Sequence, residues 1–222
     1  MTPAQILLAL VPAAYVAGAV PFGIVVGLAK GVDVRKAGSG NIGATNVGRV
    51  LGARYFWIVF ILDVLKGMLP CLAAGACLEF HPTDRMGYLL WMLVGLTAIL
   101  GHVFSVFLRF KGGKGVATSF GVALGIWPFF TLPALVAVGV FVVVFEIWRY
   151  VSAASIAGAI VFPIVYVLIG LALHWPIWAE QSPLLAAAIL LALLIIYKHR
   201  ANIGRLVAGT ENKILKRENV KT

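Results

Sequence analysis

Long apolar stretches separated by short polar segments run along most of the chain. Residues 4–29, for example, contain no charged side chain. A helix that crosses a membrane needs about 20 mainly apolar residues. The pattern therefore predicts membrane-spanning helices at 4–29, 55–78, 87–108, 151–173 and 183–197.

The apolar stretch at residues 115–148 is too long for one crossing. Its 34 residues carry no charge before Glu146, and as a single helix they would extend about 51 Å against a hydrocarbon core of roughly 30 Å. Two prolines at 128 and 133 favour a turn in the middle. We therefore expect two short spans here, which makes an all-α integral membrane protein with seven transmembrane helices.

The basic residues favour one orientation of these seven spans. With the N-terminus outside, sixteen of the eighteen Lys and Arg residues lie at the inner face, while Arg85 faces outward and Lys66 lies within a span. Lys and Arg are enriched in cytoplasmic loops. A six-span arrangement would place seven basic tail residues outside. We therefore expect a cytoplasmic C-terminus and a single domain over 1–222, with a short basic tail at about 206–222.

Composition agrees with a membrane protein. Hydrophobic residues make up 62% of the chain and charged residues 12%, with a mean hydropathy of +1.02, whereas soluble domains are about 25% charged. The net charge of +10 is attributed to the inner-face bias rather than to a nucleic-acid partner. The first basic residue is Lys30, so the first span lacks the basic start of a signal peptide and is expected to be retained. No metal or cofactor is predicted, because no cluster has ligand spacing, and Cys71 and Cys77 are interpreted as core residues.

Three polar segments share the predicted inner face. The first polar segment is Gly38–Arg49, the second is Gly101–Ser119 and the third is Lys198–Asn212. All three combine glycine or amide residues with basic ones. Backbone N–H groups in glycine-rich turns bind phosphate oxygens, and arginine binds two oxygens at once. The segments therefore predict phosphate binding at one membrane surface.

Neither of the two glycine-rich segments is a nucleotide-binding motif. Gly38-x-Gly40-x-x-Gly43 matches the dinucleotide fingerprint in spacing but lies between membrane spans instead of after a strand. The sequence 111–115, Lys-Gly-Gly-Lys-Gly, lacks the Gly-Lys-Ser/Thr ending of a P-loop.

Charged residues within the spans are expected to pair. Asp63 and Lys66 are three residues apart on one helix face, as are Glu146 and Arg149, and both are interpreted as self-neutralising structural pairs. His102 is expected to cap or pack at the end of a span. His199 lies among basic groups, which lowers its proton affinity and suits a neutral donor or acceptor.

The three segments together resemble one family. Ser39-Gly-Asn-Ile-Gly-Ala-Thr-Asn-Val-Gly-Arg49, Phe110-Lys-Gly-Gly-Lys-Gly-Val-Ala-Thr118, and His199-Arg-Ala-Asn202 with Ala208-Gly-Thr-Glu211 are similar to the three signature motifs of the bacterial acyl-phosphate:glycerol-3-phosphate acyltransferases, the PlsY family. The resemblance extends to chain length, seven spans and motif order. It implies transfer of a fatty acyl group from acyl phosphate to the 1-hydroxyl of glycerol 3-phosphate, with lysophosphatidic acid and phosphate as products.

The resemblance also implies roles for single residues. In the first segment, Ser39 and Arg49 would hold phosphate, while Lys111 and the following glycines would form a glycerol-phosphate loop. The residues expected in catalysis are Ser39, Arg49, Lys111, His199 and Asn202. Those expected to bind substrate are Gly40, Asn41, Thr45, Asn46, Gly112, Gly113, Lys114, Gly115 and Ser152. Glu211 would be structural.

Some alternatives remain open at the level of sequence. Either His199 or a substrate phosphate would take the hydroxyl proton, and a phosphate or organic-anion transporter is the alternative function. The expected partners are acyl phosphate, glycerol 3-phosphate and membrane lipid, with no nucleic acid and no obligate protein partner. The expected location is the bacterial cytoplasmic (inner) membrane, with the active site on the cytoplasmic face.

Overall fold

The structure, a computed structural model, describes residues 2–214, and the regular elements in this part of the chain are all helices, with no strand. The last eight residues of the predicted basic tail, which include Lys216, Arg217 and Lys221, lie outside the described residues. The elements are α1 (Pro3–Ala19), α2 (Phe22–Leu28), α3 (Ala44–Leu51), α4 (Ala53–Cys77), α5 (Arg85–Val103), the 3₁₀ turn η1 (Val106–Leu108), α6 (Val116–Gly125), α7 (Thr131–Trp148), α8 (Val151–Ala172), α9 (Ser182–Lys198) and α10 (Arg200–Val207).

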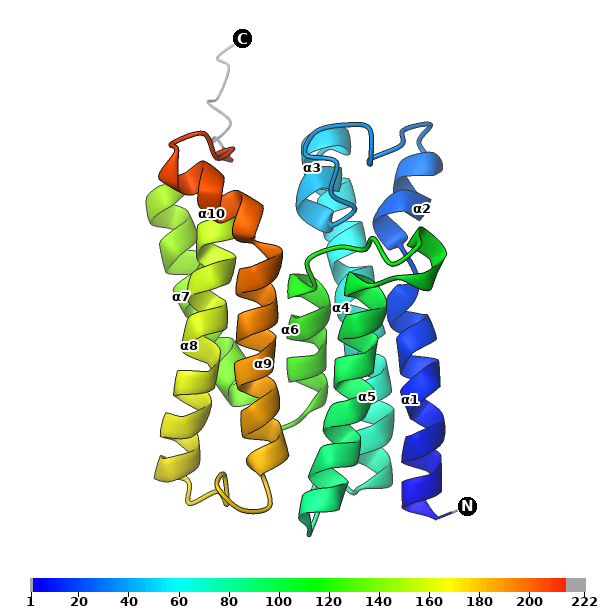
Figure 1. Cartoon of the computed structure of the whole chain (residues 1–222), viewed down its shortest axis with the longest axis vertical. Coiled ribbons are helices and arrows are strands. Elements are labelled where there is room, and N and C mark those ends of the chain that lie inside the picture. Colours follow the sequence, from blue (N-terminus) through cyan, green and yellow to red (C-terminus); the bar gives the residue numbers. More distant parts are fainter. Residues whose placement is uncertain (1, 215–222) are drawn as a thin grey trace.

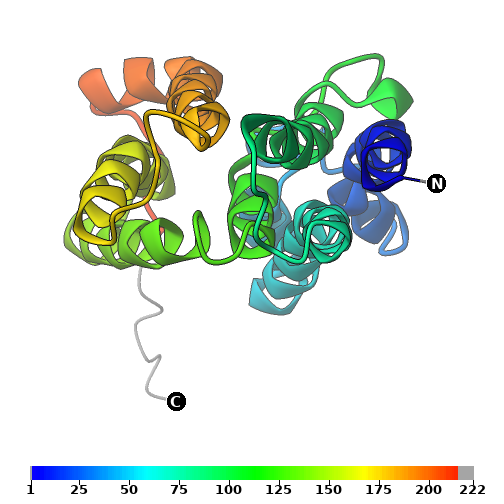
Figure 2. The same cartoon turned by 90° about the horizontal axis from the view of Figure 1, so that it is seen from below.

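The helices form two groups that lie side by side (Figure 1). In one group α1 packs along α5, and α4 packs on α1, α5 and α6; in the other, α8 lies between α7 and α9. Contacts of α5 with α9 and of α6 with α7 join the groups, and Figure 2 shows both groups end-on. The first and second polar segments belong to one group, and the third belongs to the other.

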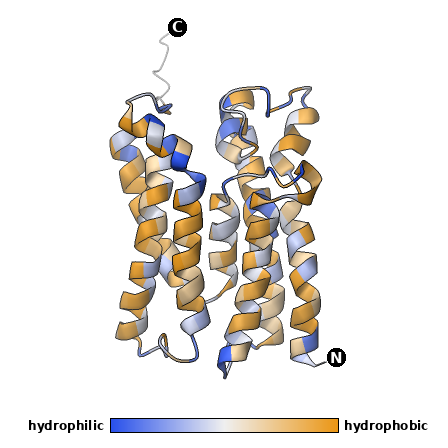
Figure 3. Cartoon of the chain, in the orientation of Figure 1, coloured by the Kyte–Doolittle hydropathy of each residue, from blue (hydrophilic) through white to orange (hydrophobic). Residues whose placement is uncertain are grey.

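The helix surfaces explain this packing. The long helices are apolar on all sides, as Figure 3 shows by colour, which is typical of helices surrounded by lipid and other helices. Small residues allow close contact between them: a Cβ at Gly18 would overlap the backbone of Ala98, and one at Gly101 would overlap the carbonyl of Tyr15. Close approach at small residues is a common way for helices to associate in membranes.

The expected turn in residues 115–148 is present. Residues 126–130 separate α6 from α7, and the Trp127–Pro128 peptide bond is cis. Part of this turn is buried in an aromatic cluster, in which Phe129 contacts Trp91 and Trp175, and Phe130 contacts Tyr166, while Trp127 is exposed. The split into two helices is therefore as predicted.

Five helical segments are long and apolar enough to cross a membrane, and the count rises to six if α9 and α10, which are bent by 56°, form one span. The seven expected spans are thus found only in part. The difference is α6, whose ten residues extend about 15 Å. The first span, expected at 4–29, is found as one candidate span at Pro3–Leu28, in which α1 ends at Ala19 and α2 begins at Phe22.

The expected charge pairs are confirmed. Lys66 Nζ lies 2.7 Å from Asp63 Oδ1, both side chains are buried, and Lys66 also donates to the carbonyl oxygen of Val20 at 2.8 Å. Arg149 is paired with Glu146. Cys71 and Cys77 are free, and Cys71 is buried in the core.

Candidate active site

The first polar segment is organised by the buried side chain of Asn46. Its Oδ1 accepts from the Ser39 amide at 2.7 Å, and its Nδ2 donates to the carbonyls of Val34, Ala37 and Asn41 at 3.0, 3.1 and 2.8 Å. These bonds use both N–H groups of the amide. Asn46 therefore shapes the loop from inside, which differs from the substrate-binding role expected for it.

The remainder of this segment faces outward. Asn41 Oδ1 accepts from the Gly43 amide at 2.8 Å, and Gly43 is the N-cap residue that immediately precedes α3. Ser39 and Gly40 are exposed, and Gly40 adopts a left-handed φ of +70°. Arg49 lies exposed in the last turn of α3, and its side chain makes no hydrogen bond or ion pair with any other residue in the range 2–214. Ser39, Gly40 and Arg49 are thus available to a ligand.

The second polar segment folds back over the end of α5. The amide of Gly112 donates to the carbonyl of Val103 at 3.1 Å, and that of Gly113 donates to the carbonyl of His102 at 3.0 Å. Carbonyls in the last turn of a helix have no partner within the helix, so these two glycines satisfy them. Their amides are therefore engaged in the fold, in contrast to the expected phosphate-binding role of the glycine loop.

This fold-back separates the two lysines of the segment. Lys111 is exposed and lines a pocket with Arg35 and Arg109. Lys114 is partly buried and donates its Nζ proton to Asn202 Oδ1 in the third segment. The structure thus joins Lys114, expected only as a substrate contact, to Asn202, while the expected catalytic Lys111 lies elsewhere.

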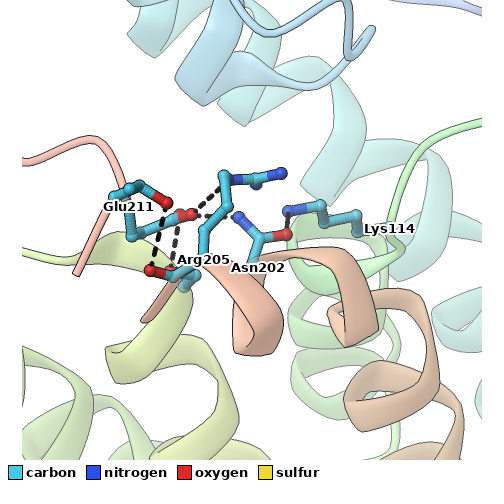
Figure 4. A network of polar contacts seen from close by, with 6 residues as sticks. Lys114, Asn202, Arg205 and Glu211 are labelled. Carbon is cyan, nitrogen blue, oxygen red and sulfur yellow. Dashed lines mark hydrogen bonds and ion pairs between the residues drawn. The ribbon is translucent and has the colours of Figure 1, made fainter. Parts of the chain in front are cut away.

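The third segment forms a polar network around Glu211 (Figure 4). Glu211 Oε1 accepts from Asn202 Nδ2 at 2.6 Å and from Ser152 Oγ at 2.8 Å. Its Oε2 accepts from Arg205 Nε at 2.7 Å. The network runs on through Asn202 to Lys114, so Glu211 fixes the orientation of the Asn202 amide. Its contacts are those of the structural residue that we expected, whereas Arg205 was not among the predicted site residues.

Charges from the first and third segments act on Lys114. Burial is the largest cause and lowers the pKa of Lys114 to about 8; the negative charge of Glu211 opposes it, and the positive charges of Arg205, Arg49 and Lys198 add to the lowering. Glu211 itself is held ionised: although partial burial raises its pKa, hydrogen bonds from Asn202, Ser152 and Arg205 bring about a net lowering. The result is a concentration of positive charge, which suits an anionic ligand.

His199 is buried beside this charge. Its Nδ1 lies 2.8 Å from the carbonyl oxygen of Ile195, and because a carbonyl only accepts, the ring proton belongs on Nδ1 and Nε2 is left as an acceptor. Burial and the nearby positive charge of Lys114 lower the pKa of His199 to about 4. At neutral pH the imidazole is therefore uncharged, as we expected.

A buried polar cluster lies beneath the second segment and consists of Asp63, Lys66 and His102. His102 Nδ1 is 3.7 Å from Asp63 Oδ1. On the other side of the ring, a Cβ at Gly113 would overlap His102 Nε2. The cluster therefore supports the loop that leads to Lys114, which is more than the packing role predicted for His102.

Comparisons with known proteins show the family of the chain. Residues 8–209 match the profile of a family described as glycerol-3-phosphate acyltransferase. A glycerol-3-phosphate acyltransferase of Geotalea daltonii is 45% identical over 204 residues, covering 91% of this chain and 95% of that one. One from Chlorobium phaeobacteroides is 39% identical over 229 residues, covering 94% and 96%.

Solved structures show the same fold. A crystal structure of PlsY, an integral membrane glycerol 3-phosphate acyltransferase, in its glycerol 3-phosphate form is 40% identical, with a TM-score of 0.82, and the match covers 97% of this chain and 99% of that one. The lysophosphatidic acid form matches with a TM-score of 0.79 over 94% and 95% of the two chains.

Proposed function

The chain belongs to the glycerol-3-phosphate acyltransferase family, and we propose that it transfers a fatty acyl group from acyl phosphate to the 1-hydroxyl of glycerol 3-phosphate. Lysophosphatidic acid and inorganic phosphate are the products. The relatives are named as acyltransferases, and the solved relatives are described in glycerol 3-phosphate and lysophosphatidic acid forms, which favours this reaction over the transport of anions.

The observation that supports the proposal best is the meeting of the three segments around Lys114. This lysine, from the second segment, is bonded to Asn202 of the third, and the charge of Arg49 from the first lowers its pKa. Both substrates carry phosphate. A site with several cations on one membrane face therefore suits a water-soluble phosphate and a phosphate attached to an acyl chain.

We assign the cations to the phosphates of the two substrates. Arg49 is exposed and its side chain has no partner among residues 2–214, so its planar guanidinium can bind two oxygens of one phosphate. Lys114 supplies a second positive charge in a partly buried setting, where charge contacts are stronger than in bulk water. Ser39 lies in the loop before α3 and Thr45 lies in the first turn of that helix, whose N-terminal amides also favour an anion. Lys114 thus takes the catalytic place expected for Lys111.

Chemistry at this site depends on positioning and charge. The 1-hydroxyl oxygen attacks the acyl carbonyl carbon, the bond from that carbon to the phosphate oxygen breaks, and phosphate leaves with the electron pair. Phosphate is a good leaving group, so alignment and electrostatic stabilisation supply most of the barrier reduction. Asn202, fixed by Glu211, and the neutral His199 orient the glycerol phosphate.

The proton of the hydroxyl passes to a substrate phosphate in this proposal. With a pKa of about 4, His199 is a weak base at neutral pH. The second pKa of a phosphate monoester is about 6, so a phosphate oxygen is the stronger base of the two. The contact of Nδ1 with Ile195 leaves Nε2 as an acceptor that aligns the hydroxyl without taking its proton.

The membrane arrangement completes the proposal. We place the N-terminus outside, the C-terminus inside, and the three segments at the cytoplasmic face of the bacterial inner membrane, because most Lys and Arg residues belong to that face of the predicted topology, and because hydrophilic residues gather at the end of the bundle where the segments lie (Figure 3). We count α6 as a seventh, shortened crossing. Phe129 and Phe130 in the turn after it are buried among aromatic residues, which covers part of the non-helical backbone.

Purified protein incubated with palmitoyl phosphate and glycerol 3-phosphate tests the function. We expect stoichiometric release of lysophosphatidic acid and phosphate, and no turnover when palmitoyl-CoA replaces palmitoyl phosphate. Robust turnover with palmitoyl-CoA as sole donor contradicts the assigned donor, and absence of product with both donors contradicts the reaction.

A further inference from the structure

A second basic pocket lies apart from the Lys114 network. It has a volume of about 390 Å³ and is lined by Arg35, Phe107, Leu108, Arg109 and Lys111. None of these residues contacts the hydrogen-bonded network of Glu211 and Asn202. The reaction proposed above does not use this pocket.

The pocket has an excess of positive charge. Arg35 is neutralised by Asp33, to which it donates two side-chain hydrogen bonds of 2.9 and 2.8 Å. Arg109 and Lys111 have no acidic partner in the described residues 2–214. Two cations are therefore left uncompensated beside an open cavity, which suits an anion such as a phosphate group.

The pocket lies at the edge of the bundle. The chain that carries it, residues 104–111, is attached to α1: Tyr15 donates to the carbonyl of Phe104 at 2.8 Å, and Ser105 donates to the carbonyl of Ala19 at 2.6 Å. Both views place this segment beside the junction of α1 and α2, on the outside of the molecule (Figures 1 and 2).

Large apolar side chains project from the same segment. Phe107 is 58% exposed and Phe110 is 61% exposed, and Val106 is also exposed. Aromatic side chains together with Lys and Arg are typical of the boundary between lipid and water. Inorganic phosphate would contact only the basic side chains. A lipid would contact the basic side chains with its headgroup and the aromatic side chains with its acyl chains.

The backbone of this segment is held in an uncommon conformation. Arg109 and Phe110 are consecutive non-glycine residues with φ of +52° and +62°, a region that non-glycine residues seldom occupy. The Phe110 amide is secured by the carbonyl of Ser105 at 2.8 Å. This turn leaves Phe110 exposed next to the basic residues Arg109 and Lys111. Non-glycine residues with such uncommon backbone angles are concentrated at ligand sites.

We propose that this pocket binds the phosphate headgroup of an anionic membrane lipid. Arg109 and Lys111 contact the headgroup, and Phe107 and Phe110 lie among the acyl chains. The pocket is a lipid-binding site separate from the catalytic one, so the proposal does not depend on the reaction assigned above.

Lipid binding to the purified protein in a neutral detergent tests the site. Native mass spectrometry would compare phosphatidylglycerol with phosphatidylcholine of the same acyl chains, for the wild type, Arg109→Gln and Arg54→Gln. Arg54 is a matched control, because it is exposed on the same face but does not line the pocket. We expect a preference for phosphatidylglycerol that falls about fivefold in Arg109→Gln and is unchanged in Arg54→Gln.

Two further arms separate the sources of phosphate. Phe110→Ala should weaken phosphatidylglycerol binding while leaving turnover in phosphatidylcholine unchanged, and millimolar inorganic phosphate should not displace the lipid. If Arg54→Gln loses the preference for phosphatidylglycerol as much as Arg109→Gln does, the preference comes from the overall positive charge of the inner face, and the proposal is overturned. Equal binding of the two lipids, or displacement by inorganic phosphate, overturns it as well.

Discussion

A methyl group added at Gly113 tests the support that His102 gives to the site. Gly113 is not in the left-handed region, so alanine is allowed by its backbone. A Cβ there would, however, overlap the His102 imidazole, which is buried and packed against Asp63 on its other side. Overpacking of this kind costs about 1–3 kcal/mol. Either the ring or the loop must therefore move.

The loop shift would reach the proposed chemistry through Lys114, the next residue. A displacement of about 1 Å at a positioning group costs on the order of 100-fold in rate. We expect Gly113→Ala to lower kcat/KM for glycerol 3-phosphate roughly 10- to 100-fold. The KM should rise more than kcat falls, because Lys114 binds the ground state as well as the transition state. Turnover with palmitoyl phosphate, with melting temperature recorded in detergent, measures both effects.

A double mutant makes this prediction specific. His102→Ala removes the ring that the new methyl group would meet, so Gly113→Ala should cost less in that background, with a coupling of about 1–2 kcal/mol. Gly139→Ala is the matched control, because nothing lies within 4 Å of a Cβ at that position. If the two substitutions are additive, or if Gly113→Ala behaves like Gly139→Ala, the reasoning is refuted.

Three other substitutions test the charges of the site. Arg49→Lys keeps the charge but loses the planar guanidinium, so kcat/KM should fall roughly 30- to 1000-fold, which corresponds to about 2–4 kcal/mol. The control Arg54→Ala should change kcat/KM very little. A fully active Arg49→Lys enzyme contradicts the two-oxygen contact between Arg49 and phosphate. Because the pKa of Lys114 is lowered to about 8, its charge is lost as pH rises through 8, so kcat/KM for glycerol 3-phosphate should fall above pH 8. Lys114→Arg should abolish this fall of kcat/KM above pH 8. If the fall persists in Lys114→Arg, another group causes it. Glu211→Gln keeps an acceptor but turns an amide N–H₂ group toward Arg205, so its melting temperature should fall less than that of Glu211→Ala; equal losses would show that the charge of Glu211 is what matters.

The sequence predicts the helices well because lipid imposes a strong pattern. Every long apolar stretch is helical, with a break after Ala19 in the first one, and the excess length of residues 115–148 with its prolines located the turn between α6 and α7. The packing around that turn was not predictable. The aromatic residues that contact Phe129 come from α5 and from the segment after α8, and no local pattern relates them.

The site was predicted at the level of segments and less well at the level of single residues. Lys111 and Lys114 stand in nearly identical surroundings in the sequence, each next to glycine. Only the return of the chain over the end of α5 places Lys114 next to Asn202 and Lys111 in the pocket with Arg35. The substrate-binding role expected for Asn46 stays a prediction, because an amide that closes a loop from inside, as this one does, and one that faces a substrate look the same in a motif.

The glycines of the second segment follow from the membrane as much as from the chemistry. The carbonyls of His102 and Val103 end a helix in which they have no partner, and close to lipid an unsatisfied carbonyl is costly. A Cβ at Gly112 would overlap both carbonyl oxygens, so only glycine lets the returning chain come close enough to donate to them. The same return fixes Lys114 one residue beyond Gly113, above the buried Asp63, Lys66 and His102 cluster. One short stretch of backbone therefore closes a helix end and positions a cation for phosphate, which explains why a mostly hydrophobic chain places glycine between two lysines.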